Sequence, residues 1–305
     1  MKSVYTPKQI SRAIDVSESS IKRWCDKGVI STQYTAGGHR RIAMASLVDF
    51  LRGSKHKLTT PEALGLPPTS GQTERVVHRS KEQFGEALLA GDQALCWQIA
   101  LDLYLAGHKI SVICDEVLAA AVNRIGDQWS CGEAEVYQER YGCQILLRVI
   151  HELRSLLPPL DVDAPLALGG APAGDPYALG THMAELVLCD SGWNAATLGE
   201  NLPFDTFAAA IREKRPRLFW LSVSHMTDQQ TFLDGYSKLH AEFAESVAFV
   251  VGGKALTDDI RQQMQFAAYC DSMQHLQGFA ETLRQPNQPP TNTAETSQHP
   301  SRNGS

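Results

Sequence analysis

The sequence predicts a multidomain chain with an N-terminal winged helix-turn-helix, a central four-helix bundle and a C-terminal α/β domain built on a parallel sheet. Three observations predict this division. Basic residues gather near the N-terminus, apolar residues recur at helical spacing in the middle of the chain, and short apolar runs alternate with amphipathic segments after residue 165. A chain of 305 residues has room for about two or three domains.

The winged helix-turn-helix is expected within residues 1–55. Thr6 followed by Pro7 predicts a helix start, because threonine caps a first turn and proline suits the first helical position. A second helix is expected at about residues 19–26, ended by Gly28. Two short helices joined by a turn allow the second helix to lie in a DNA major groove.

A wing and a third helix complete this domain. Residues 29–42 are expected to form two strands, with Gly37 and Gly38 in the tight turn between them. The helix expected at residues 44–51 closes the small core with its apolar side chains.

The charge is divided unevenly along the chain. Residues 1–57 hold 11 Lys and Arg against four acidic residues, a net charge of +7, and the remainder carries −13. A basic head on an acidic body favours binding of the DNA phosphate backbone by the head alone. A solvated basic face is the alternative that charge by itself leaves open.

The other boundaries follow from composition and periodicity. Residues 56–78 are rich in Gly, Pro and Thr and are expected to be a linker. The four-helix bundle is expected at residues 79–160 and the α/β domain at residues 161–284. Residues 285–305 contain no large apolar side chain, so a disordered tail is expected there.

Small residues end three apolar runs of the α/β domain, which we expect to have a Rossmann-like parallel sheet. These ends are Gly169-Gly170, Ser222-Val223-Ser224 and Gly252-Gly253. Ligands of such sheets bind beyond the carboxyl ends of the strands, where small residues permit close approach. A binding site is therefore expected at that edge.

Other classes of protein are disfavoured. No apolar run is long enough for a membrane helix and the N-terminus lacks a signal pattern, which indicates a soluble cytoplasmic protein. The seven cysteines are scattered, so we expect reduced thiols rather than a disulfide scaffold or a zinc site. No nucleophile triad, phosphate-binding glycine loop or metal triad is present, and we expect no enzymatic role.

Residues 3–52 resemble the MerR-type winged helix-turn-helix family in the motifs T-P-K-Q-I-S, V-S-E-S-S-I-K-R-W-C-D-K-G-V-I and T-A-G-G-H-R-R-I. The resemblance implies a transcriptional regulator, and specifically a repressor, that binds a double-stranded DNA operator as a homo-oligomer, a dimer or a tetramer. The DNA-binding residues expected on this basis are Lys8, Ser20, Lys22, Arg23, Tyr34, His39, Arg40 and Arg41.

The α/β domain resembles the cobalamin-binding fold, whose pattern is D-x-H-x-x-G, S-x-L and G-G at characteristic spacing. Here Asp175-Pro176-Tyr177-Ala178-Leu179-Gly180 is followed after 41 residues by Ser222-Val223-Ser224, and after 27 more by Gly252-Gly253. The family's histidine is the lower ligand of cobalt and its aspartate orients that ring. Tyr177 stands at the histidine position, and Asp175 and Gly180 are kept.

The predicted bundle resembles the cap of CarH-type light-sensing carotenoid repressors, which carry W-x9-E-H above the cofactor. Trp129 and Glu139 match this motif, but Arg140 replaces the histidine and a guanidinium cannot donate to a metal. The resemblance thus implies a cobalamin site in which both axial histidines are substituted. Its residues, if cobalamin is retained, are Trp129, Glu139, Arg140, Asp175, Tyr177, Gly180, Ser222, Ser224, Gly252 and Gly253.

Three functions remain open from the sequence. The first is a regulator whose sensor domain uses another small molecule or a protein partner as effector. The second is an adenosylcobalamin-dependent, light-responsive repressor, and the third is a corrinoid carrier for methyl transfer. The DNA-binding head disfavours the third. His182 and His225 lie near the expected site but are interpreted as ordinary polar residues at element ends.

Overall fold

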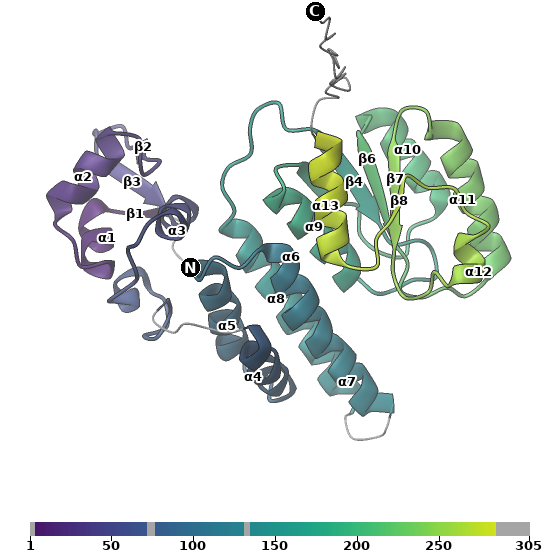
Figure 1. Ribbon diagram of the computed structural model, residues 1–305, viewed down its shortest axis with the longest axis horizontal. Helices are drawn as coiled ribbons and strands as arrows, with labels where there is room; N and C mark the ends of the chain where they lie inside the picture. The colour runs from purple at the N-terminus through teal and green to yellow at the C-terminus, as the bar shows by residue number, and fades with distance from the viewer. Residues whose placement is uncertain (1–3, 72–76, 131–134, 285–305) are drawn as a thin grey trace, which may run out of the picture.

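The computed structural model describes residues 4–71, 77–130 and 135–284, without the side chains of residues 127–130 and 136. Three units follow one another along the chain: a small head, a helical unit and an α/β domain (Figure 1). In this view the head and the α/β domain lie on opposite sides of the helical unit. The tail expected at residues 285–305 lies outside the described residues.

Two short helices, α1 (Pro7–Ala13) and α2 (Glu18–Asp26), begin the head. Thr6 and Gln9 form a reciprocal capping box at the start of α1, and Pro7 takes the first helical position. The hydroxyl of Ser17 accepts a hydrogen bond from the Ser20 N–H at the start of α2. The sequence therefore satisfies the free N–H groups of both helices.

A three-stranded antiparallel sheet packs beside these helices. Its order is β1 (Val4–Tyr5), β3 (Arg40–Ala43), β2 (Gln33–Tyr34). The β2–β3 hairpin turns at Gly38, whose φ of 75° suits glycine. Helix α3 (Met44–Gly53) follows at once and buries Leu47 in the core of the head.

The segment expected to be a linker is partly folded, which corrects the prediction for residues 58–71. Leu58, Leu64 and Leu66 are buried, and the short 3-10 helix η1 (Pro61–Leu64) packs on α1. The Tyr5 hydroxyl donates to the Leu64 carbonyl oxygen at 2.9 Å. Three leucines spaced among Pro, Gly and Thr residues therefore extend the core of the head.

The helical unit contains α4 (Val77–Leu89), α5 (Gln93–Leu105), a long third stretch and α8 (Val136–Ser155). The third stretch runs without a break through α6 (Ile110–Ile113), η2 (Cys114–Ala119) and α7 (Ala120–Ser130). Its middle part, η2, is a π-helix, a widening that is frequent at functional sites. The core of the unit contains fully buried apolar side chains from all four stretches, among them Phe84, Ile99, Val117 and Ile145.

The α/β domain has a five-stranded, wholly parallel sheet, which confirms the predicted sheet class. The strands are β4 (Leu166–Gly170), β5 (Asn194–Thr197), β6 (Leu218–Ser222), β7 (Ala248–Gly252) and β8 (Ala268–Tyr269), in the order β5-β4-β6-β7-β8. The connecting helices are α9 (Leu179–Asp190), α10 (Phe204–Lys214), α11 (Gln229–Phe243) and α12 (Asp258–Arg261). The order reverses between β4 and β6, where sheets of this class bind ligands.

Alternate residues of β6 enter two different cores. Leu218 and Trp220 pack on the side of α9, while Phe219 and Leu221 pack on the side of α10 and α11. Every residue of β6 is buried, as expected of a central parallel strand covered on both faces. The first face continues into the helical unit, so both share one core (Figure 1).

Helix α13 (Met273–Arg284), which the sequence analysis missed together with β8, joins the two units. The Asp115 carboxylate in η2 accepts hydrogen bonds from the N–H groups of Met273 and Gln274 at the start of α13. The buried hydroxyl of Ser111 donates to Gln277 at 2.5 Å. These contacts fix the helical unit against the sheet and define the space between them.

Candidate ligand cavity and nucleic-acid interface

A cavity of about 880 Å³ lies between the helical unit and the carboxyl ends of the strands. Helices α7 and α8 form one wall, and the ends of β6 and β7 with the first turns of α9 and α13 form the other. Most of the sequence-predicted cofactor residues lie in its lining: Glu139, Arg140, Tyr177, Gly180, Ser222, Ser224, Gly252 and Gly253. The volume lies within the range of small-molecule sites, about 300 to 1,000 Å³.

Asp175 does not line the cavity but ties together two of the loops that form it. Its side chain is completely buried. One carboxylate oxygen accepts the N–H of Tyr177 at 3.0 Å, and the other accepts the N–H groups of Ser224 at 2.5 Å and His225 at 3.1 Å. This corrects the role that the resemblance implied, because the carboxylate is occupied by backbone amides rather than by a side-chain ring.

Tyr177 presents its ring to the cavity and is 39% exposed. The ammonium group of Lys254 lies 5.8 Å from the centre of this ring, a cation–π arrangement. The His225 ring lies 6.5 Å from that of Tyr177, outside the lining. His182 instead packs edge-on against His151 of α8, with 5.2 Å between ring centres.

The described lining contains no imidazole. A histidine-ligated cobalamin needs a neutral nitrogen donor below or above cobalt, and neither a phenol nor a guanidinium is an equivalent donor. The residues at the two axial positions, Tyr177 and Arg140, therefore do not fit that form of the cofactor. Among the residues that the structure describes, no cluster of three metal-binding side chains is present.

Glycine at two positions keeps the strand edge open. A β-carbon on Gly180 would lie 2.5 Å from the Ser222 hydroxyl oxygen, and one on Gly252 would lie 2.6 Å from the Cys270 carbonyl oxygen. Both distances are shorter than atoms tolerate, so the backbone approaches more closely here than any other residue permits. The small residues of the matched pattern thus stand where neighbouring segments pack too closely for a larger side chain.

The wall from α8 carries an ion pair. The Arg140 Nε atom lies 3.5 Å from a carboxylate oxygen of Glu139, and the Arg140 side chain is largely exposed. The Cys143 thiol, one turn further, lies 3.9 Å from the other Glu139 oxygen, and burial raises the pKa of that thiol to about 11. The Trp129 side chain lies outside the described part of the chain.

The sequence analysis missed several lining residues. Lys254 directly follows the Gly252-Gly253 pair, so its position at a strand end was a usable signal. Trp220 and Met183 have the pattern of ordinary core residues, and only the fold shows that they face a cavity. Asp115 and Met273 come from η2 and α13, and neither a π-turn nor the last helix was predicted.

The predicted DNA-binding residues all lie on the head, and two of them are paired with acids. The Lys22 ammonium lies 2.8 Å from the Glu18 carboxylate one turn earlier on α2, and this contact lowers the pKa of Glu18. The Arg40 guanidinium lies 2.5 Å from Asp26, at the end of α2, and 5.6 Å from the Tyr34 ring centre. The Asp26 contact therefore joins α2 to the hairpin.

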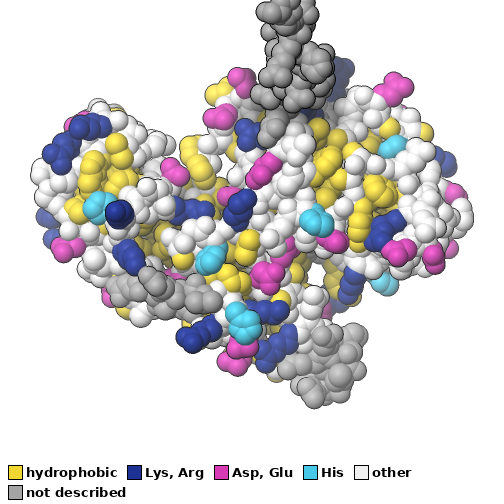
Figure 2. Space-filling model, in the orientation of Figure 1, with side chains coloured by type: hydrophobic (Ala, Val, Ile, Leu, Met, Phe, Trp, Pro, Cys, Tyr) yellow, Lys and Arg dark blue, Asp and Glu magenta, His cyan; other side chains and the backbone are white. Residues whose placement is uncertain are grey.

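The other predicted DNA-binding residues differ in their exposure and in their hydrogen bonds. Lys8, Arg23 and His39 are exposed, and Figure 2 shows Lys and Arg side chains at the outer end of the head. The Ser20 hydroxyl lies 2.9 Å from that of Ser17, within the cap of α2. Arg41 donates to the Arg40 carbonyl oxygen at 3.0 Å. Trp24 packs against Phe50 in the head, with 5.0 Å between the ring centres.

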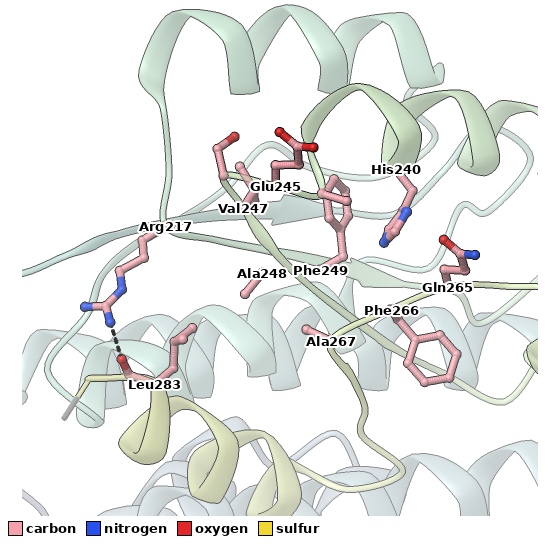
Figure 3. Close-up of a pocket in the computed structure, with 12 residues that line it drawn as sticks. Arg217, His240, Glu245, Val247, Ala248, Phe249, Gln265, Phe266, Ala267 and Leu283 are labelled. Atoms are coloured by element: carbon pink, nitrogen blue, oxygen red, sulfur yellow. Dashed lines mark hydrogen bonds between the residues drawn. The ribbon is translucent and has the colours of Figure 1, made fainter. Parts of the chain in front are cut away.

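A second cavity of about 500 Å³ opens at the amino ends of β6 and β7 (Figure 3). Arg217, His240 and Phe249 line it, and Arg217 donates to the Leu283 carbonyl oxygen at 2.5 Å. Burial lowers the pKa of His240. This cavity lies at the edge of the sheet opposite the one at which parallel α/β domains bind ligands.

Comparison with known families assigns two parts of the chain. Residues 4–55 match the helix-turn-helix domain family, and residues 81–154 match the B12 binding domain family. The chain therefore contains a region that matches a helix-turn-helix domain, followed by one that matches a B12 binding domain, a combination that fits a non-enzymatic regulator. No curated protein matches the sequence. Among the described residues, no helix is long and apolar enough to cross a membrane.

Solved structures resemble about two thirds of this chain. A monomethylamine corrinoid protein of Methanosarcina barkeri is 18% identical, with a TM-score of 0.56, and the match covers 68% of this chain and 100% of that chain. A cobalamin-binding protein from Desulfitobacterium hafniense DCB-2 is 15% identical over 68% of this chain and 98% of its own, with a TM-score of 0.37. At such identity, the first of these likenesses establishes a shared fold.

Proposed function

We propose that this chain is a MerR-type winged helix-turn-helix repressor whose cobalamin-binding-like domain controls oligomerisation and DNA binding without histidine-ligated cobalamin. The observation that carries the proposal is the union of a helix-turn-helix match at residues 4–55 with a B12 binding match at residues 81–154. The second of these regions supplies the helical wall of the large cavity. One chain thus contains both a candidate DNA-binding domain and a cavity large enough for a small-molecule ligand.

In this proposal α2 enters the major groove and the β2–β3 hairpin acts as the wing. Lys22 and Arg23 on α2 contact bases or backbone, and Arg40 and Arg41 on the wing hold phosphates. The Asp26–Arg40 contact supports this geometry, because it sets the angle of the wing against α2 in the free protein. Phosphate then competes with Asp26 for the guanidinium.

The head also has a direct contact with the helical unit. The Arg52 guanidinium, at the end of α3, donates to the carbonyl oxygens of Tyr104, in the last turn of α5, and of His108, beyond its end. The same group lies 4.0 Å from the centre of the Tyr104 ring. In this proposal the Arg52 contact transmits a change in the helical unit to the head. Two DNA half-sites related by two-fold symmetry require at least a dimer of such chains.

Two alternatives involve cobalamin. The fold likeness to the Methanosarcina barkeri corrinoid protein is compatible with a corrinoid ligand, which either an adenosylcobalamin-dependent, light-responsive repressor or a corrinoid carrier for methyl transfer would use. The head argues against the carrier. The absence of imidazole from the described lining argues against cobalt ligation by the protein, although a cobalamin that keeps its own base would not need it.

Fluorescence anisotropy on duplex DNA selected from a random pool tests the proposal. We expect salt-dependent binding, and we expect the double variant Arg40→Ala, Arg41→Ala to flatten the log–log salt slope by about two units, one per lost phosphate contact. Arg212→Ala, an exposed arginine of α10 far from the head in sequence, is the matched control and should leave the slope unchanged. Absence of DNA binding at low salt, or an unchanged slope in the double variant, would contradict the proposal.

A further inference from the structure

Several hydrogen-bond donors at the strand edge of the large cavity have no acceptor among the described residues. Helix α9 begins here and has no side-chain cap, so the N–H groups of its first turn lack protein partners. The Ser222 hydroxyl, on a side chain only 9% exposed, lines the cavity and has no hydrogen-bond partner among the described residues. The hydroxyls of Ser222 and Ser224 lie 2.5 Å and 3.7 Å from where a β-carbon of Gly180 would stand. They therefore flank the first turn of α9.

The charged side chains around this edge also favour an anionic ligand. Three acidic side chains line the cavity, and each is already engaged: Asp115 by backbone N–H groups of α13, Glu139 by Arg140, and Asp271 by His275 at 2.7 Å. Lys254 has no carboxylate partner in the described structure and contacts only the Tyr177 ring. The free helix N-terminus, two hydroxyls and one unpaired ammonium together favour an anionic group.

Much of the remaining lining is apolar. Leu179 and Met183 of α9, Trp220 and Val250 of the sheet and Leu276 of α13 line it. An anion that occupied the strand edge would carry a substantial apolar body over these side chains, because burying this surface contributes about 25 cal/mol per Å². A small inorganic anion would leave most of the cavity unfilled.

We infer that the large cavity binds an amphipathic organic acid, with its anionic group at the first turn of α9 between Ser222 and Lys254 and its apolar rings or chain against Met183, Trp220 and Leu276. This inference rests on the proposed sensor role and names the class of effector. It differs from a corrin ligand because no metal donor is required. The Arg140–Glu139 pair lies on the opposite wall of the cavity.

Two fluorescent dyes with the same ring skeleton test the inference: the anionic anilinonaphthalenesulfonate and the neutral N-phenylnaphthylamine. The whole protein should bind the anionic dye at one saturable site, more tightly than the neutral dye. Lys254→Met should weaken the anionic dye about tenfold, the loss expected for one charge-assisted contact, and leave the neutral dye unchanged. Ser222→Ala should weaken the anionic dye by about threefold to tenfold.

Matched variants keep the result interpretable. Lys254→Arg retains the charge and should retain the affinity, and Lys238→Met, an exposed lysine of α11, should bind both dyes as the unmodified protein does. Dye that bound the second cavity of Figure 3 would not respond to Lys254→Met. Equal affinity for the two dyes, or an unchanged affinity of Lys254→Met for the anionic dye, would overturn the inference.

DNA binding of the same samples separates this inference from the proposed function. If the dye results fail while the protein still binds DNA, only the ligand class is overturned. If the anionic dye binds as expected but no DNA binds at low salt, the cavity assignment stands and the regulator proposal is overturned.

Discussion

The buried carboxylate of Asp175 provides the most demanding test of how the cavity is built. Its two oxygens accept three backbone N–H groups, from Tyr177, Ser224 and His225. The substitution Asp175→Asn keeps the size of the side chain but replaces one oxygen with an amide nitrogen that can only donate. At least one backbone N–H then faces another donor inside a site that water does not reach.

The cost follows from the contacts that are lost. A hydrogen bond to a charged acceptor contributes about 1.5 to 3 kcal/mol, and a buried donor left without a partner costs a similar amount. We therefore expect Asp175→Asn to destabilise the loops after β4 and β6 by about 3 kcal/mol. Such a change corresponds to a roughly 100-fold increase in the equilibrium constant for local opening.

Hydrogen–deuterium exchange measured by mass spectrometry on peptides that cover residues 176–178 and 223–226 is the direct assay. The backbone amides of Ser224 and His225 should lose protection in Asp175→Asn, while peptides from the helical unit should keep theirs. Asp234→Asn is the matched control, because Asp234 accepts from Gln230 on the exposed face of α11, and its effect should stay within about 0.5 kcal/mol. Unchanged protection at Ser224 and His225 would refute the structural role of Asp175.

Three further predictions concern other contacts. Arg52→Ala should loosen the head from the helical unit and speed trypsin cleavage at Lys55 severalfold, whereas Arg12→Ala on α1 should not; equal cleavage rates would contradict this coupling contact. Asp26→Asn should release Arg40 from its ion pair and tighten DNA binding, measured by fluorescence anisotropy, by up to about fivefold. Asp49→Asn is the control, and weaker DNA binding by Asp26→Asn would contradict the prediction. Because burial raises the pKa of Cys143 to about 11, the rate of its alkylation by iodoacetamide should increase as the pH rises towards that value. A rate that levels off near pH 8.5, within the ordinary thiol range of about 8 to 9, would contradict the buried environment of this thiol.

Local sequence signals account for most of the architecture. Thr6-Pro7 predicted the capped start of α1, and the run at residues 218–223 predicted β6, because a strand covered on both faces must be apolar throughout. The match in spacing predicted that Gly180, Ser222 and Gly252 lie at one edge of the sheet, since these residues end or follow parallel strands, and all three line the large cavity. Such signals depend only on residues within one helix or strand, so they can be recognised without knowing which elements pack against it.

What the sequence could not supply depends on contacts between distant elements. Leu58 and Leu64 lie among Pro, Gly and Thr residues, so their burial against α1 has no periodic signal. Helix α13 does carry apolar residues at helical spacing, a signal that went unrecognised, but its position against η2 follows from Asp115, a residue 158 positions earlier than Met273. Asp175 illustrates the same limit, because only the fold shows that backbone amides occupy its carboxylate.

The central claim is that the chain keeps the architecture of a cobalamin-binding domain without a nitrogen ligand for cobalt. The most direct test mixes the purified protein with adenosylcobalamin in the dark, passes it through a desalting column and records its absorption spectrum. We expect the protein to emerge without corrin bands. Retention of corrin with a band pattern that indicated a nitrogen ligand from the protein would contradict the claim, because the described lining contains no such donor.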